Sequence, residues 1–148
     1  MALTPPLSLF NTLTRRKEEF KALQAPEVGL YTCGPTVYDY AHIGNMRSYV
    51  FADTLQRVLT YNGYQVKRVM NITDVGHLVG DTDGGEDKID VGAKREGKNP
   101  LDIAKFYTDQ FFADLTALNI IKPEHVLPAT AAIPEQIEII KILLTQGY

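Results

Sequence analysis

One segment, Leu30–Asn45, constrains the fold of this chain more than any other. It reads as a buried strand that ends at Cys33, then a loop with glycine and proline, then a His-x-Gly-Asn step into a long amphipathic helix. A helix N-terminus has unpaired N–H groups and about half a unit of positive charge, which suits a polyphosphate. Gly44 lets the backbone approach a ligand closely, and His42 and Asn45 can donate hydrogen bonds to oxygens that gain charge in a transition state. The segment therefore predicts a phosphate site.

His42 and Asn45 also allow a simpler interpretation, in which they only cap the helix, because a four-residue match is common by chance. Cys33 favours the functional interpretation. It is the single cysteine of the chain and stands nine residues before His42, at the strand end where ligands bind in open α/β sheets. Taken alone, one cysteine is more often a small buried apolar residue.

Length, composition and charge narrow the class of protein. The 148 residues are 45% hydrophobic and 22% charged, which fits one ordinary domain that can bury a core. The net charge is −3 and the lysines and arginines are scattered, so no basic face predicts nucleic-acid binding by this part of the chain. No apolar run reaches about 18 residues and no signal peptide is recognisable, so we expect a cytoplasmic protein without a membrane partner.

Hydrophobic periodicity predicts alternating strands and helices. We expect strands at residues 7–14, 28–32 and 64–73, and helices at 43–62, from Asn99–Pro100 onward, and at 133–146. The strand–helix–strand unit over 28–73 should have parallel strands and a right-handed crossover. Between these elements we expect a solvated charged turn at Arg15–Glu19 and a connector at 123–130. Residues 74–88 should form a solvated loop that contains His77. Its carboxylates do not have the spacing of an EF-hand, and a lid over the phosphate site is the alternative function of this loop.

The same periodicity predicts which side chains are buried. Phe20 and Leu23 should pack the charged segment onto the sheet. The first helix should bury Val50, Phe51, Thr54, Leu55, Val58 and Leu59. The second should bury Ala104, Tyr107, Phe111, Leu115 and Leu118, and the third Ile137, Ile140 and Leu144.

Three stretches, Tyr31–Tyr49, Phe10–Leu13 and Arg68–Asp74, carry a resemblance to a known family. They resemble the N-terminal part of cysteinyl-tRNA synthetases, which are class I aminoacyl-tRNA synthetases, and the similarity continues over nearly the whole chain. The resemblance implies an α/β fold with a Rossmann-like parallel sheet and flanking helices, incomplete at this length. Residues 1–148 would be the N-terminal portion of the catalytic, nucleotide-binding domain, so we expect a fragment of a larger enzyme or a truncated relative.

The resemblance also implies a reaction. The carboxylate of L-cysteine would attack the α-phosphate of ATP, supplied with magnesium, and a ribose hydroxyl of tRNA(Cys) would then take the cysteinyl group from the adenylate. His42 and Asn45 would be catalytic, and Pro35, Thr36, His42, Gly44 and Asn45 would bind ATP. Asn45 replaces the last histidine of the family's His-Ile-Gly-His motif, and an amide donates a hydrogen bond but cannot become cationic.

Cysteine recognition is implied at the end of the same strand. Cys33 matches the first zinc ligand of the family, and Gly34 and Thr73 match positions of the substrate pocket. Zinc with an open position would prefer the thiol of cysteine to the hydroxyl of serine. The family's other zinc ligands and its Lys-Met-Ser-Lys-Ser motif are not in this sequence. We therefore predict that the chain alone lacks aminoacylation activity and binds zinc weakly or not at all.

Three other functions stay open at this point. The first is a cysteine ligase that passes the activated cysteine to an amino sugar, because the segments that would choose the acceptor are not in this sequence. The second is a small nucleotidylyltransferase with a His-x-Gly-His motif, although Cys33 would then be unexplained. The third is a non-catalytic module that binds neither ATP nor cysteine.

Overall fold

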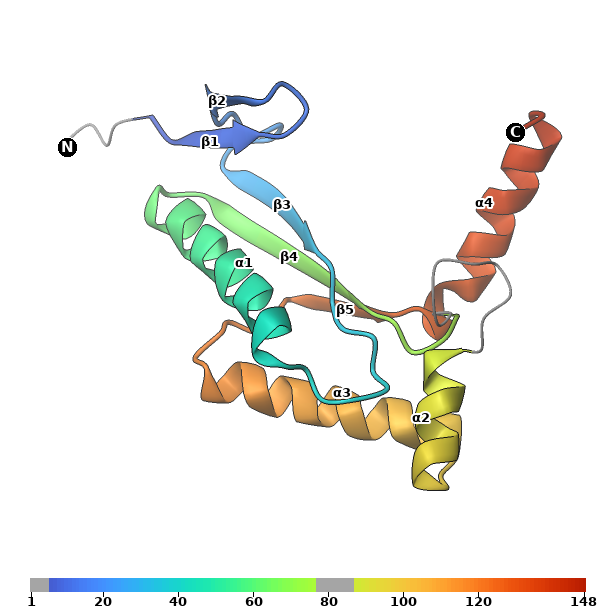
Figure 1. The fold of residues 1–148 in the computed structure, drawn as a ribbon. Coiled ribbons are helices and arrows are strands. Elements are labelled where there is room, and N and C mark those ends of the chain that lie inside the picture. The colour runs from blue at the N-terminus through green and yellow to red at the C-terminus, as the bar shows by residue number, and fades with distance from the viewer. Residues whose placement is uncertain (1–5, 77–86) are drawn as a thin grey trace.

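A computed structural model describes residues 6–76 and 87–148 of the chain. Over these ranges Figure 1 shows a small antiparallel sheet, a parallel sheet and several α-helices. In chain order the elements are β1 (Ser8–Asn11), β2 (Arg16–Glu19), β3 (Glu27–Thr32), α1 (Ile43–Tyr61), β4 (Gln65–Ile72), α2 (Lys88–Glu96), α3 (Pro100–Ala117), β5 (His125–Pro128), the 3₁₀ helix η1 (Thr130–Ala132) and α4 (Ile133–Thr145). The predicted α/β class, with a parallel sheet and flanking helices, is confirmed.

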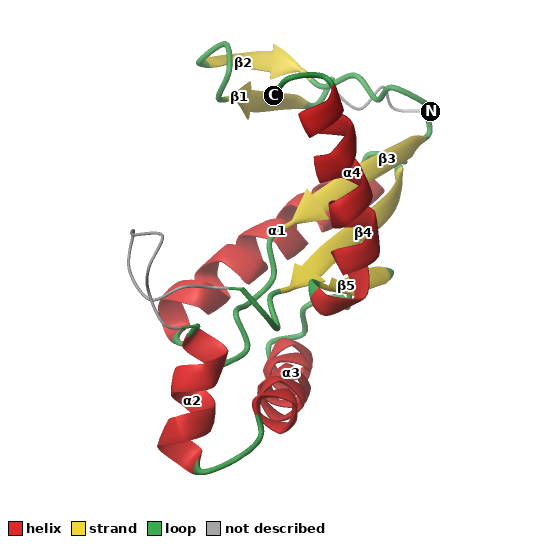
Figure 2. Cartoon of the chain, turned by 90° about the vertical axis from the view of Figure 1, so that its right-hand side faces the viewer, coloured by secondary structure: helices red, strands yellow, loops and turns green. Residues whose placement is uncertain are grey.

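The parallel sheet has the strand order β3-β4-β5, with β4 in the centre. Val28 lies opposite Val66 and Thr32 opposite Met70, and Val69 of β4 lies opposite His125 of β5. α1 connects β3 to its parallel neighbour β4, so the predicted strand–helix–strand unit is confirmed. Figures 1 and 2 both place α2 near the carboxyl-terminal ends of β3 and β4, where ligands bind in open α/β sheets.

The core lies between one face of this sheet and the helices α1, α2 and α3. Alternate residues of β4, namely Met70 and Ile72, point into it, as the period of two in a strand requires. α3 begins as predicted, because Asn99 accepts a hydrogen bond from the backbone N–H of Leu101 at 2.8 Å. Its buried residues are Ile103, Ala104, Tyr107, Phe111 and Leu115. The predicted burial of Leu118 is wrong.

The first helix has the predicted position but presents a different face to the core. Its buried residues are Met46, Tyr49, Ala52, Asp53 and Leu59, so Leu59 is the one correct member of the predicted set. Val50, Phe51, Thr54 and Val58 are exposed and Leu55 is only partly buried. The reason is that Asp53 turns inward, where its Oδ1 accepts a hydrogen bond from the backbone N–H of Ile121 at 2.8 Å. A periodicity count treats aspartate as a surface residue and cannot anticipate this partner.

Asp53 lies near a second buried charge, Arg68 of β4, whose side chain is 0% exposed. Arg68 Nε donates to Thr32 Oγ1 at 3.2 Å, and Nη1 makes longer contacts to Gln56 Oε1 at 3.4 Å and to the carbonyl of Ile121 at 3.5 Å. Within the described residues Nη2 has no hydrogen-bond partner. Burial lowers the pKa of Arg68, and the Asp53 carboxylate opposes that shift. This pair joins β4 to α1 and to the segment after α3.

Two segments that the sequence predicts as turn or connector are strands. Arg16–Glu19 is fully exposed, as expected, but it forms β2 and pairs with β1. Backbone hydrogen bonds make this hairpin, and they need no apolar side chains. His125–Pro128 is β5, which pairs with β4. β5 is only four residues long and includes Pro128, so it gives a weak strand signal in the sequence. Its pairing partner, β4, is distant in sequence.

Other expectations about packing are wrong or lie outside the described residues. Phe20 makes an edge contact with Tyr64, with ring centroids 5.4 Å apart, but Leu23 is fully exposed. α4 has the predicted bounds to within one residue, yet it buries no side chain. Its predicted buried residues Ile137, Ile140 and Leu144 are all exposed, because an apolar face in the sequence does not specify a surface to pack on.

Helix α2 was not anticipated by the sequence analysis. Of the loop expected at 74–88, residues 77–86 lie outside the described residues, and with them His77 and the possible lid. None of the described helices combines the length and the apolarity that a membrane-spanning helix requires.

Candidate functional site

The chain leaves β3 through a close approach of two backbones at Gly34. The N–H of Gly34 donates to Asn71 Oδ1 at 3.0 Å. A Cβ on Gly34 would lie 1.7 Å from the carbonyl oxygen of Asn71 and 2.9 Å from Met70 Cγ. Only glycine fits at this point, because any side chain would push the loop off β4.

The loop then rejoins the sheet beyond the end of β4. The N–H of Thr73 donates to the carbonyl of Pro35 at 2.9 Å, and the N–H of Val37 donates to the carbonyl of Thr73 at 3.1 Å. Thr36 and Thr73 thus form a parallel bridge. Val37, 1% exposed, anchors the loop in the core. The loop before α1 is therefore fixed to the strand end on both sides of the bridge.

His42 and Asn45 form a capping box at the N-terminus of α1. His42 Nδ1 accepts from the N–H of Gly44 at 3.0 Å, and Asn45 Oδ1 accepts from the N–H of His42 at 3.1 Å. A Cβ on Gly44 would come within 2.9 Å of the His42 ring. Because Nδ1 is an acceptor, the neutral imidazole carries its proton on Nε2. His42 and Asn45 thus cap the helix, as the simpler interpretation predicts. The cap uses Nδ1 of His42 and Oδ1 of Asn45, so Nε2–H of His42 and the Nδ2 amide of Asn45 can still donate to a ligand.

A cavity of about 360 Å³ opens beside this cap. Its wall consists of residues 34–42 of the loop, Asn45 and Tyr49 of α1, Lys88 of α2, and Tyr107 and Phe111 of α3. Four of the five predicted ATP-binding residues, namely Pro35, Thr36, His42 and Asn45, line it. The fifth, Gly44, uses its N–H for the imidazole of His42. The volume and the mixed lining are those of a small-molecule site.

Cys33 lies on a second cavity, of about 310 Å³, between β3 and α1. Tyr49 lines both cavities, so the thiol and the His42 cap are on neighbouring sites that share one wall. Burial raises the pKa of Tyr49 to about 12, and charge on Cys33 adds to the shift. Desolvation also raises the pKa of Tyr31, and Cys33 contributes a smaller increase.

Asn71 of β4 brings together two residues predicted for the substrate pocket. Its Oδ1 accepts from the Gly34 N–H and from Tyr31 Oη, the latter at 3.0 Å, and its Nδ2 donates to Thr73 Oγ1 at 3.1 Å. The sequence analysis assigned Asn71 no role. The signal was present, because asparagine is disfavoured in strands and needs a local reason to be there.

Zinc is not accounted for by the residues that the structure describes. Among residues 6–76 and 87–148, no three His, Cys, Asp or Glu side chains are grouped so that they could hold a metal ion. The exposed thiol of Cys33 alone does not fit a tetrahedral site.

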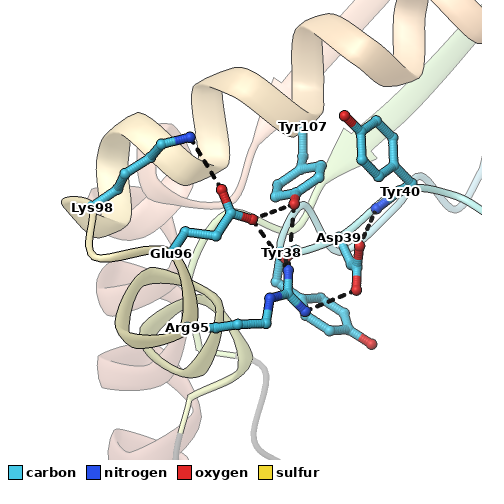
Figure 3. Close-up of polar contacts among 7 residues, drawn as sticks. All are labelled: Tyr38, Asp39, Tyr40, Arg95, Glu96, Lys98 and Tyr107. Carbon is cyan, nitrogen blue, oxygen red and sulfur yellow. Dashed lines mark hydrogen bonds and ion pairs between the residues drawn. The ribbon is translucent and has the colours of Figure 1, made fainter.

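Arg95 of α2 holds the loop from outside the cavity (Figure 3). Its Nη1 donates to Asp39 Oδ2 at 2.9 Å, and its Nη2 donates to the carbonyl of Tyr38 at 3.2 Å. The neighbouring Glu96 accepts from the hydroxyl of Tyr107 and from Lys98 Nζ, the latter at 3.1 Å. Helices α2 and α3 are thereby tied to the loop that lines the cavity. The sequence analysis missed Arg95, which is more than fifty residues from Asp39.

The Glu96 contacts predict acid sensitivity. The Tyr107 hydroxyl, followed by Lys98 and Arg95, lowers the pKa of Glu96 from 4.5 to about 2. A carboxylate with a lowered pKa in the folded state stabilises the fold above pH 4.5, and that contribution is lost as the pH falls towards 2. Urea midpoints measured from pH 6 down to 2 should therefore fall less steeply for Glu96→Gln than for the parent chain. Parallel pH profiles of the two proteins would contradict this account.

The sequence of the chain is similar to those of known proteins. Residues 19–148 match the family described as tRNA synthetases class I (C) catalytic domain. A protein of Treponema denticola named cysteine–tRNA ligase is 54% identical over 142 residues, which cover 96% of this chain and 29% of that protein. Cysteine–tRNA ligase 1 of Burkholderia lata is 51% identical over 97% of this chain and 30% of its own length. The chain thus spans about 30% of the length of the curated relatives it matches.

The family match covers most of the chain, and the α/β fold with a parallel sheet agrees with it. The chain belongs to the class I (C) tRNA synthetase catalytic domain family.

Proposed function

We propose that this chain is the N-terminal portion of the catalytic domain of a cysteine–tRNA ligase. In this proposal the whole protein uses ATP, with magnesium, to convert L-cysteine to cysteinyl-adenylate, and transfers the cysteinyl group to tRNA(Cys). One observation carries it: the capped N-terminus of α1 opens on a cavity lined by four of the five predicted ATP-binding residues, next to the cavity of Cys33. The names of the relatives support the same reading.

In this proposal the cap binds and polarises phosphate. Nε2–H of His42 and the Nδ2 amide of Asn45 are donors at a helix N-terminus, where negative charge is favoured. Pro35 and Thr36, which line the same cavity, would contact the nucleotide as well. The reaction needs no covalent enzyme intermediate, so catalysis consists of positioning the cysteine carboxylate and stabilising charge on the α-phosphate.

The proposal places cysteine near the end of β3, at Cys33, Gly34 and Thr73. Asn71 fixes the Gly34 backbone relative to the Thr73 hydroxyl, so the two residues keep one spacing. Cys33 would supply one thiolate to a zinc ion whose other ligands come from outside the described residues. A cytoplasmic location belongs to the same proposal. Transfer to an amino sugar instead of tRNA would share every step up to the adenylate.

A chimaera tests the proposed function directly. Residues 1–148 would replace the matching segment of the Treponema denticola relative, and cysteine-dependent exchange of pyrophosphate into ATP would be measured. We expect exchange with cysteine and none with serine. His42→Ala in the same chimaera should remove most of the exchange. A folded chimaera that exchanges no pyrophosphate, beside an active parent relative, would refute the assignment, and charging of tRNA(Cys) would distinguish it from an amino-sugar ligase.

A further inference from the structure

The side chain of Asn71 connects two residues that are proposed for the cysteine pocket. Asn71 belongs to β4, and Thr73 follows at the end of that strand on the same side, away from the core. Asn71 Oδ1 accepts from the N–H of Gly34 and from the hydroxyl of Tyr31, both at 3.0 Å. Asn71 Nδ2 donates to Thr73 Oγ1 at 3.1 Å. One amide thus contacts β3, the loop after β3 and the end of β4.

The backbone N–H of Gly34 determines which way round this amide lies. A backbone N–H can only donate, so the Asn71 atom that faces it is the carbonyl oxygen Oδ1. The nitrogen Nδ2 therefore faces Thr73, and because an amide nitrogen only donates, Thr73 Oγ1 is the acceptor in that bond. Within residues 6–76 and 87–148, the hydrogen of the Thr73 hydroxyl has no acceptor. The Thr73 hydroxyl can therefore donate to a ligand.

The backbone of Thr73 is joined to the wall of the 360 Å³ cavity. Its N–H donates to the carbonyl of Pro35 at 2.9 Å, and its carbonyl accepts from the N–H of Val37 at 3.1 Å. Pro35 and Val37 both line that cavity. Thr73 is thus connected to Gly34 through Asn71 and to the proposed ATP cavity through its backbone. The group of cysteine that has to reach the α-phosphate of ATP is its carboxylate.

We propose that Asn71 is a positioning residue, which makes the Thr73 hydroxyl a donor to the carboxylate of bound cysteine. The proposal rests on the proposed function, which supplies the cysteine. Asn71 acts through Thr73: its amide occupies one lone pair of Thr73 Oγ1, so the hydroxyl hydrogen is left for the ligand. An ionised carboxylate only accepts hydrogen bonds, and bonds to a charged acceptor are the stronger ones. One carboxylate oxygen takes this bond, and the other attacks the α-phosphate.

The substitution Asn71→Asp tests this polarity with little change of shape. A carboxylate still accepts from Gly34 and Tyr31, but its second oxygen cannot donate, so the Thr73 hydroxyl has to donate to it and is lost to the ligand. In the chimaera described above, the KM for cysteine in pyrophosphate exchange should rise about tenfold, with kcat changed by less than about twofold. Thr73→Val should raise this KM by the same factor, and Thr73→Ser, which keeps the hydroxyl, should retain the parent KM.

The double variant separates this role from the effect of the added charge. If Asn71→Asp acts through the Thr73 hydroxyl, adding it to Thr73→Val should not raise the KM for cysteine further. Direct repulsion of cysteine by the new carboxylate would raise the KM again in the Thr73→Val background. The matched control is Asn99→Asp, which adds the same charge at the start of α3 and keeps the cap, so it should leave this KM unchanged.

The outcomes separate the two proposals. In an active chimaera, an unchanged KM for cysteine in Asn71→Asp, or additive rises in the double variant, would overturn the role of Asn71 and leave the proposed function standing. If urea denaturation shows that Asn71→Asp is unfolded, the Thr73 pair decides, because an equal KM in Thr73→Val and Thr73→Ser would overturn the donor role. A folded parent chimaera without exchange would count against the proposed function and, with it, against this role.

Discussion

Replacing Gly34 by alanine is expected to destabilise the fold by more than about 3 kcal/mol, the range reached when an added side chain has no space. The new Cβ would lie 1.7 Å from a backbone oxygen of β4, so rotation of a flexible side chain cannot relieve the clash. The loop would have to move away from Asn71, and its hydrogen bond to the Gly34 N–H would be lost. Urea denaturation followed by circular dichroism measures the free energy of unfolding.

Gly29, which lies in β3 five residues before Gly34, provides the matched control. A Cβ at Gly29 meets no atom within 4 Å, so Gly29→Ala should change the free energy of unfolding by less than about 1 kcal/mol. If Gly34→Ala is as stable as Gly29→Ala, the loop is not pressed against β4 as described. In the chimaera, Gly34→Ala should also raise the KM for cysteine if the variant remains folded, because Gly34 and Thr73 share Asn71.

His42→Asn is expected to lower the rate of pyrophosphate exchange by about 10²–10³-fold, the usual effect of removing one donor to a developing oxyanion. The stability should change by less than about 0.5 kcal/mol, because asparagine is as good an N-cap as any residue. The substitution therefore separates the two functions of His42: capping of α1 is kept, and the Nε2–H donor is removed. Pyrophosphate-exchange assays on the chimaera measure the rate, and urea denaturation of the same protein measures the free energy of unfolding.

The control for this substitution is His125→Asn. His125 is an exposed histidine at the start of β5 and does not line the cavity. The substitution His125→Asn should leave the rate of pyrophosphate exchange unchanged. Unchanged activity of His42→Asn would show that His42 only caps the helix, which is the simpler interpretation that the sequence allowed. A large loss of stability would instead show that the imidazole packs in a way that the amide cannot replace.

The local parts of the fold follow from the sequence, whereas the long-range parts do not. The start of α3 at Asn99–Pro100 and the helix that begins after His42 depend on residues a few positions apart, so they were predicted correctly. The inward turn of Asp53 depends on a backbone N–H of Ile121, 68 residues away. No pattern within α1 contains that information, so the predicted buried face was wrong.

The candidate site shows the same division. Four of the predicted ATP residues come from one continuous loop and helix start, and the structure places them on one cavity. Lys88, Tyr107 and Arg95 reach that region from α2 and α3, which only folding brings there. Asn71 could have been noticed as an unfavourable residue in a strand, but its contacts with Gly34 and Thr73 require the parallel pairing of β3 and β4.

The bridge between Thr36 and Thr73 limits how this site can move. Two backbone hydrogen bonds, on either side of the bridge, hold the loop to the chain just after β4, so the loop cannot swing away without breaking both of them. Pro35 and Thr36, proposed for ATP, and Gly34 and Thr73, proposed for cysteine, are therefore joined to the end of β4 by one set of contacts. During a catalytic cycle the distance between the two proposed substrates would then be set by these backbone contacts, and no hinge would lie between them.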